Sequence, residues 1–141
     1  MIPNTVNSKT AMKNSAYLIG ISQYKDHSNA GVPNDLELLV RALLHRNYPR
    51  STIRVFNDTH TTLAGLHDLF GQIRSEYRDV ATGSCYVHIG ASGTFAQNPL
   101  RGGMLPGDGD VLDFDTAFPF AALNEYLPAR LGIRVVVTLD T

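Results

Sequence analysis

The stretch that most constrains the fold of this chain is residues 84–93, Ser-Cys-Tyr-Val-His-Ile-Gly-Ala-Ser-Gly. Residues 85–89 have the β-branched and aromatic content of a buried central strand. The small residues from Gly90 to Gly93 then allow the backbone to turn sharply out of a sheet. Because open α/β sheets bind ligands where their strands reach the carboxyl end, we expect a functional site directly after this strand.

Three further apolar runs predict strands that accompany this central one. They lie at residues 16–22, 52–56 and 133–139, and each is short and nearly continuous in apolar character. A Gly- and Pro-rich region, residues 94–110, contains a short apolar piece and predicts a small hairpin. The last run, residues 133–139, comes at the end of the sequence, so we expect it to form an open edge of the sheet.

Helical patterns separate these strands. Apolar residues at 3-and-4 spacing predict one helix that begins at Pro33 and a second that is capped by Thr61 or Thr62. A third helix is expected at residues 118–127, entered through Pro119 and stopped by Pro128. Strands that alternate with helices predict an α/β three-layer sandwich around a mostly parallel sheet of about four strands.

The chain of 141 residues fits a single domain that is large enough to bury a core. We assign this domain to residues 15–141. Residues 1–14 are polar and lack the apolar segment of a secretory signal, so they predict a flexible leader.

Composition excludes several classes of function. The net charge is −1 and the basic residues are dispersed, so no surface for nucleic acid is expected. No apolar run approaches the roughly 18 residues that a membrane span requires. The single cysteine, Cys85, excludes an intramolecular disulfide, and a cytoplasmic location is the default expectation.

Five segments of the chain form a recognisable set: residues 17–24, 31–39, 89–93, 102–109 and 135–141. In this order they resemble the large-subunit region of the caspase and metacaspase family of cysteine peptidases. The bacterial and fungal metacaspase-like branch is more similar than the animal caspases. The resemblance implies a caspase-like fold, cysteine-type endopeptidase activity, and peptide or protein substrates.

The resemblance implies a Cys-His dyad, and neither member is present in this sequence. The general-base His belongs to an apolar-Ser-Gly-His-Gly pattern, and here the matching residue is Ser92. The nucleophilic Cys belongs to an Asp-x-Cys pattern that begins at Asp140, and it would follow Thr141. A serine hydroxyl has no basicity near neutral pH. We therefore expect an inactive form, and the alternative is an engineered or truncated form of an active cysteine endopeptidase.

Other residues offer no obvious replacement for the dyad. Cys85 and His88 are three positions apart on a strand of period two, so their side chains should lie on opposite faces of the sheet. They therefore cannot form a nucleophile–base pair, and His88 is interpreted as a sheet-face histidine. The other four histidines fall in loops or helices without metal-ligand spacing and are assigned no role; they are His27, His45, His60 and His67.

The resemblance also implies a specificity pocket, which does not require the missing dyad. In metacaspases an acidic pocket receives a substrate Arg or Lys, and by resemblance Asp35 and Asp140 match the residues that supply its carboxylates. The residues alone allow another interpretation. Asp35 would complement the dipole at a helix start, and Asp140 would be a turn residue at a strand end.

No cofactor or metal site is expected from the sequence. The resemblance allows calcium, but the acidic region has no EF-hand spacing and predicts a solvated loop; its carboxylates are Asp108, Asp110, Asp113 and Asp115. A third hypothesis is a non-catalytic binding or assembly module. In this case a partner strand or a second copy of the chain would pair with the open edge at residues 133–139.

Overall fold

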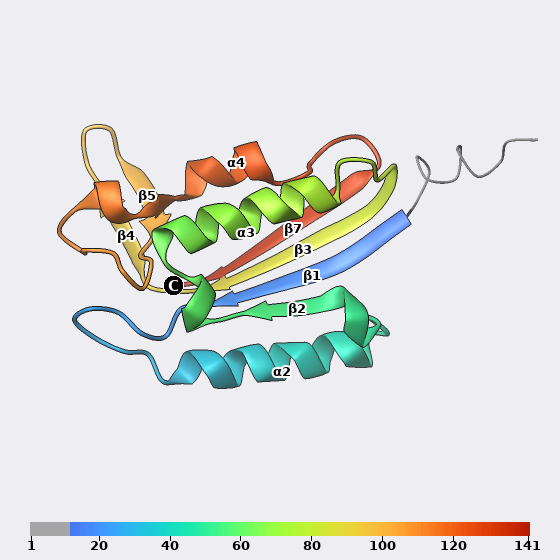
Figure 1. The fold of residues 1–141 in the computed structure, drawn as a ribbon, viewed down its shortest axis with the longest axis horizontal. Helices are drawn as coiled ribbons and strands as arrows, with labels where there is room; N and C mark the ends of the chain where they lie inside the picture. The colour runs from blue at the N-terminus through green and yellow to red at the C-terminus, as the bar shows by residue number, and fades with distance from the viewer. Residues whose placement is uncertain (1–11) are drawn as a thin grey trace, which may run out of the picture.

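Four parallel strands form the central sheet of the computed structural model, which describes residues 12–141 (Figure 1). They are β1 (Met12–Gly20), β2 (Ile53–Phe56), β3 (Thr82–Gly90) and β7 (Ile133–Asp140). Their order across the sheet is β2-β1-β3-β7, so β1 and β3 are central and β7 is an outer strand. The prediction of a mostly parallel sheet is confirmed, and so is the edge position of β7 within the described residues.

Helices cover both faces of this sheet (Figure 1). Helix α2 (Gly31–His45) lies on one side, and α3 (Leu63–Glu76) and α4 (Leu123–Tyr126) lie on the other. Side chains of β1 alternate between the two layers: Leu18 is buried with α2, whereas Tyr17 and Ile19 are buried with α3. Within residues 12–141, no helix has the length and apolar character that a membrane crossing requires.

A small antiparallel sheet follows the end of β3. Its strands are β4 (Gly93–Ala96), β5 (Arg101–Met104) and β6 (Phe118–Pro119), in the order β4-β5-β6. The predicted hairpin is confirmed as β4–β5, and β6 extends it by one short strand.

The helix expected at residues 118–127 is wrong. Phe118 and Pro119 form β6, a 3-10 turn follows, and the α-helical part is only the four residues of α4. Phe118 is fully buried, and its ring centroid lies 5.0 Å from that of Phe70 in α3, while its backbone pairs with Met104. Packing of this aromatic side chain and the extended conformation of Pro119 therefore override the helical pattern.

Two other boundaries differ from prediction. Strand β1 begins at Met12, so residues 12–14 belong to the sheet rather than to a leader, and residues 1–11 of that prediction lie outside the described residues. Within the described residues, this part of β1 pairs with β3, whereas β2 pairs only with residues 16–19 of β1. Helix α2 begins at Gly31, two positions before Pro33, which places its acidic residues beyond the first turn.

Gly83 is the position at which the sheet depends most on the absence of a side chain. Its φ is +140°, and a Cβ there would lie 1.9 Å from the carbonyl oxygen of Lys13 in β1. We predict that Gly83→Ala destabilises the protein by more than about 1 kcal/mol, because both the conformation and the space are incompatible with a side chain. Urea unfolding followed by circular dichroism measures the change.

Gly71 in α3 supplies the matched control. A Cβ at Gly71 would meet nothing within 4 Å, so Gly71→Ala should stabilise the protein by about 0.5–1 kcal/mol through helix propensity. A neutral Gly83→Ala variant would show that β1 and β3 do not approach each other as described.

Candidate functional site

Three strands of the sheet end in register at the same edge. Gly20 of β1 pairs with Gly90 of β3, and Gly90 pairs with Asp140 of β7. The hydrogen bonds continue one residue further: Ile21 N–H donates to the Gly90 carbonyl at 2.9 Å, and Ala91 N–H donates to the Asp140 carbonyl at 3.1 Å. The chain that leaves β3 therefore lies beside the end of β7, as the sequence interpretation required.

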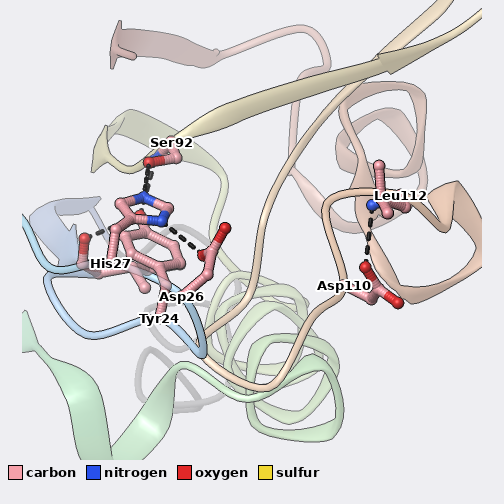
Figure 2. Close-up of polar contacts among 7 residues, drawn as sticks. Tyr24, Asp26, His27, Ser92, Asp110 and Leu112 are labelled. Carbon is pink, nitrogen blue, oxygen red and sulfur yellow. Dashed lines mark hydrogen bonds and ion pairs between the residues drawn. The ribbon is translucent and has the colours of Figure 1, made fainter.

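Ser92 lies in the two-residue link between β3 and β4 and is half-buried. Its backbone is fixed on both sides. The N–H donates to the hydroxyl of Tyr24 at 2.7 Å, and the carbonyl accepts from Leu105 N–H at 2.9 Å. Its Oγ lies 3.0 Å from Nε2 of His27, in the loop between β1 and α2 (Figure 2).

His27 connects Ser92 to a carboxylate. Nδ1 of His27 lies 2.6 Å from Oδ1 of Asp26, and this hydrogen bond is the main reason that the pKa of Asp26 is lowered (Figure 2). An ionised carboxylate only accepts hydrogen bonds, so Nδ1 carries the hydrogen and Nε2 presents a lone pair to the Ser92 hydroxyl. The His27 ring also stacks on Tyr24, with centroids 4.4 Å apart and an angle of 12° between the planes.

The contact between His27 and Ser92 was not predicted from the sequence, and His27 was assigned no role. The position of His27 in the loop after the first strand could have indicated this contact, whereas its spacing from the other histidines could not. His27 follows the first strand and Ser92 follows the third, and neighbouring parallel strands direct their following loops to one edge of the sheet.

Asp58 holds the loop that carries His27. Its Oδ1 accepts from the N–H groups of Ser22 and Gln23 at 2.9 and 3.2 Å, and its Oδ2 accepts from the Ser22 hydroxyl at 2.6 Å. Partial burial acts to raise the pKa of Asp58, but these hydrogen bonds outweigh it and the pKa is lowered. The beginning of the loop is thereby tied to the chain that follows β2.

The charges of Asp35 and Asp140 both act on His88, and Asp140 pairs with Gly90 at the end of the strand that carries this histidine. Burial is the main cause of the lowered pKa of His88, and the charges of Asp140 and Asp35 oppose it. Asp35 is the fifth residue of α2, and the first turn of this helix contains no acidic residue, so the helix-start interpretation of Asp35 is wrong. Asp140 is the last residue of β7 rather than a turn residue.

Cys85 and His88 face opposite sides of the sheet, as predicted. Cys85 is fully buried in the core with α3, and burial is the main cause that raises its pKa to about 11. On the other face, Nδ1 of His88 lies 2.8 Å from Oγ1 of Thr138 in β7. A buried thiol with such a pKa is not a nucleophile near neutral pH.

Three carboxylates of the acidic loop accept hydrogen bonds from backbone N–H groups. Asp108 accepts from Leu63 N–H at the start of α3 at 2.9 Å. Asp110 accepts from Leu112 N–H at 2.9 Å (Figure 2), and Asp113 accepts from Asp115 N–H at 3.0 Å. In the described part of the chain, no group of three or more His, Cys, Asp or Glu side chains is arranged to hold a metal ion.

A scan of the chain against protein-family models finds no match, and no curated protein matches it either. The function is therefore inferred from the two polar clusters at this edge of the sheet. One consists of Ser92, His27 and Asp26, and the other of Asp35, Asp140 and His88.

The carboxylate of Asp58 should contribute to stability in a pH-dependent way. We predict that Asp58→Asn lowers the free energy of unfolding at pH 7 by about 1 kcal/mol, because charge-assisted hydrogen bonds to Ser22 and Gln23 are weakened. A lowered pKa in the folded state means that this contribution is present above about pH 4, the range of an unfolded Asp, and is lost as the pH falls further.

Urea unfolding of both proteins at pH 7 and pH 3 measures this effect. Asp79→Asn is the control, because Asp79 is exposed and makes no hydrogen bond within residues 12–141. A difference between Asp58→Asn and the unmodified protein that is as large at pH 3 as at pH 7 would contradict the assignment.

Proposed function

We propose that this chain is a caspase-like domain, resembling the metacaspase branch, that binds peptides containing Arg or Lys and does not cleave them by thiol chemistry. The observation that carries the proposal is that the charges of Asp35 and Asp140 both act on the His88 imidazole, while Asp140 pairs with Gly90, two residues after His88, at the carboxyl edge of the sheet. Asp35 and Asp140 are the residues that the resemblance assigns to the acidic pocket.

The arrangement of the chain supports a caspase-like scaffold. A parallel sheet lies between helical layers, and a small hairpin follows the strand that would carry the general base. The end of this strand lies beside the end of β7, where the family pattern places the base and the nucleophile loop. Ser92 occupies the base position, and the thiol of Cys85 is buried on the α3 side of the sheet.

Charge explains why a cationic side chain is the expected ligand. Asp35 and Asp140 are exposed, and neither forms an ion pair within the described residues. The lowered pKa of His88 keeps its imidazole neutral at pH 7, so it does not compensate the two carboxylates. A guanidinium group could contact both carboxylates through its several N–H donors.

Peptide binding should depend on both carboxylates. We predict that Asp35→Asn and Asp140→Asn each weaken binding of a short fluorescent peptide with one Arg by about five- to tenfold, which is the effect of a partly exposed charged hydrogen bond of about 1–1.4 kcal/mol. The matched peptide carries citrulline, which keeps the shape and removes the charge. Fluorescence anisotropy at low salt measures both peptides, and Asp79→Asn is the control variant.

Two further measurements separate this proposal from its alternatives. Each Asp→Asn change should lower the pKa of His88 in NMR titrations, because the removed carboxylate favours the imidazolium form. Equal affinity for the Arg and citrulline peptides would contradict the acidic pocket. Peptide cleavage that stops on alkylation of Cys85 would contradict the absence of thiol chemistry.

A second candidate function is assembly through β7. This strand is the outer one of the described sheet, and its side chains Val136 and Leu139 are 40% and 47% exposed. An outer strand with unpaired backbone groups and exposed apolar side chains is a template for another strand. A second copy of the chain would supply such a strand.

Light scattering coupled to size-exclusion chromatography tests this assembly. We predict a mass that increases with protein concentration, and a shift toward the monomer in Val136→Lys, because edge charges oppose strand pairing. Leu131→Lys is the matched control, since Leu131 is fully exposed and precedes the strand. A monomer at all concentrations would exclude assembly through β7.

A further inference from the structure

We propose that Ser92, His27 and Asp26 form a serine acyl-transfer site that hydrolyses activated acyl esters. This activity goes beyond peptide binding and requires neither Asp35 nor Asp140. It is carried by a continuous chain of contacts, from Ser92 Oγ to His27 Nε2 at 3.0 Å and from His27 Nδ1 to Asp26 Oδ1 at 2.6 Å.

The contacts match the roles that serine acyl transfer requires. A nucleophilic hydroxyl must hydrogen-bond to a base, and a third group must orient this base. Asp26 fixes the hydrogen on Nδ1 of His27, which leaves the lone pair of Nε2 directed at the Ser92 hydroxyl. The imidazole is thus supplied by the loop after β1 and not by β3.

Tyr24 is a positioning residue for both partners. Its hydroxyl accepts from the backbone N–H of Ser92 at 2.7 Å and donates to the carbonyl of Ile21 at 2.9 Å. Its ring stacks on the ring of His27. One aromatic side chain therefore fixes the backbone of the nucleophile and the plane of the base, which reduces the freedom of two loops from different strands.

The other histidines with hydroxyl partners lack the third group. His88 contacts Thr138, and His67 contacts the hydroxyl of Tyr126 at 2.7 Å. Within residues 12–141, neither ring is hydrogen-bonded to a carboxylate. The side chain of His27 is 42% exposed and Ser92 is half-buried, so the base is open to solvent beside a partly exposed serine.

The proposed reaction begins when Ser92 Oγ attacks the carbonyl carbon of an aryl ester. A bond forms between Oγ and this carbon, the hydroxyl proton passes to His27 Nε2, and the bond to the aryl oxygen breaks. The aryl oxide leaves and the proton of His27 passes to it or to solvent. Water then attacks the carbonyl carbon of the acyl-serine while His27 Nε2 accepts a proton from it. The bond between this carbon and Oγ breaks, the carboxylic acid leaves, and the proton on His27 passes to Oγ and restores the Ser92 hydroxyl.

Solvent exposure restricts the substrate class. The side chain of Asp26 is 61% exposed, so water screens its interaction with the imidazolium that forms on His27. We therefore expect turnover of esters with good leaving groups, such as aryl esters, whose acyl transfer needs the least stabilisation of developing charge.

The test uses the complete chain, with p-nitrophenyl acetate as substrate and a fluorophosphonate as covalent probe. The probe should phosphonylate Ser92, with release of fluoride, and peptide mass spectrometry locates the adduct. Ser92→Ala and His27→Gln should each lower ester hydrolysis by about 100-fold or more, the scale of general-base catalysis. Ser75→Ala and His45→Gln, at exposed positions on α3 and α2, are the matched controls and should retain the activity.

The role of Asp26 in orienting His27 is tested with measurements that would stay the same if Asp26 only stabilised the fold. Asp26→Asn should lower kcat about tenfold with little change in KM, and ¹⁵N shifts of His27 should show the loss of the fixed Nδ1–H tautomer. Circular dichroism confirms that each variant is folded.

Three results would each overturn the proposal. They are no adduct on Ser92, hydrolysis that is unchanged in folded Ser92→Ala, and hydrolysis that is lost equally in the control variants. Because p-nitrophenyl acetate is uncharged, these results do not depend on the acidic pocket and leave the proposed peptide binding to its own test.

Discussion

The parallel pairing of β1, β3 and β7 is the constraint on which the rest of the structure depends. Gly20, Gly90 and Asp140 are in register, so three separate segments of the chain leave the sheet at one edge. This register brings His27 and Ser92, 65 residues apart in sequence, within hydrogen-bond distance. A slip of one residue in β3 would move Cys85 to the α2 face and His88 into the core, so burial of the β3 side chains also fixes the site.

Most of the fold could be predicted because its strands and helices have clear periodicity. Continuous apolar runs marked the parallel strands, and the alternation along β3 correctly separated Cys85 from His88. The failure at residues 118–127 has a tertiary cause. Phe118 pairs with β5 and packs on Phe70, and no local pattern in the sequence contains that contact.

Less of the candidate site could be predicted, because several of its side chains lie in loops, whose conformation follows no periodic sequence pattern. The resemblance to a known pattern pointed to Ser92, Asp35 and Asp140, and the register then brought Ser92 near the end of β7. No periodic pattern in the sequence predicts where His27 lies, because this residue is in a loop. Its position depends on the Asp58 carboxylate, which binds Ser22 and Gln23 at the start of the loop from 36 and 35 positions away, respectively.

The two clusters at this edge differ in how their carboxylates are used, and this difference separates the two proposed roles. The charge of Asp26 is engaged by the His27 ring, whereas Asp35 and Asp140 form no ion pair within the described residues and remain available to a cation. In the proposed arrangement, Ser92 is the attacking group, and an imidazole still lies at this edge of the sheet. The loop between β1 and α2 supplies this imidazole, that of His27. The register of the strands, and not closeness in sequence, therefore brings the base to the hydroxyl.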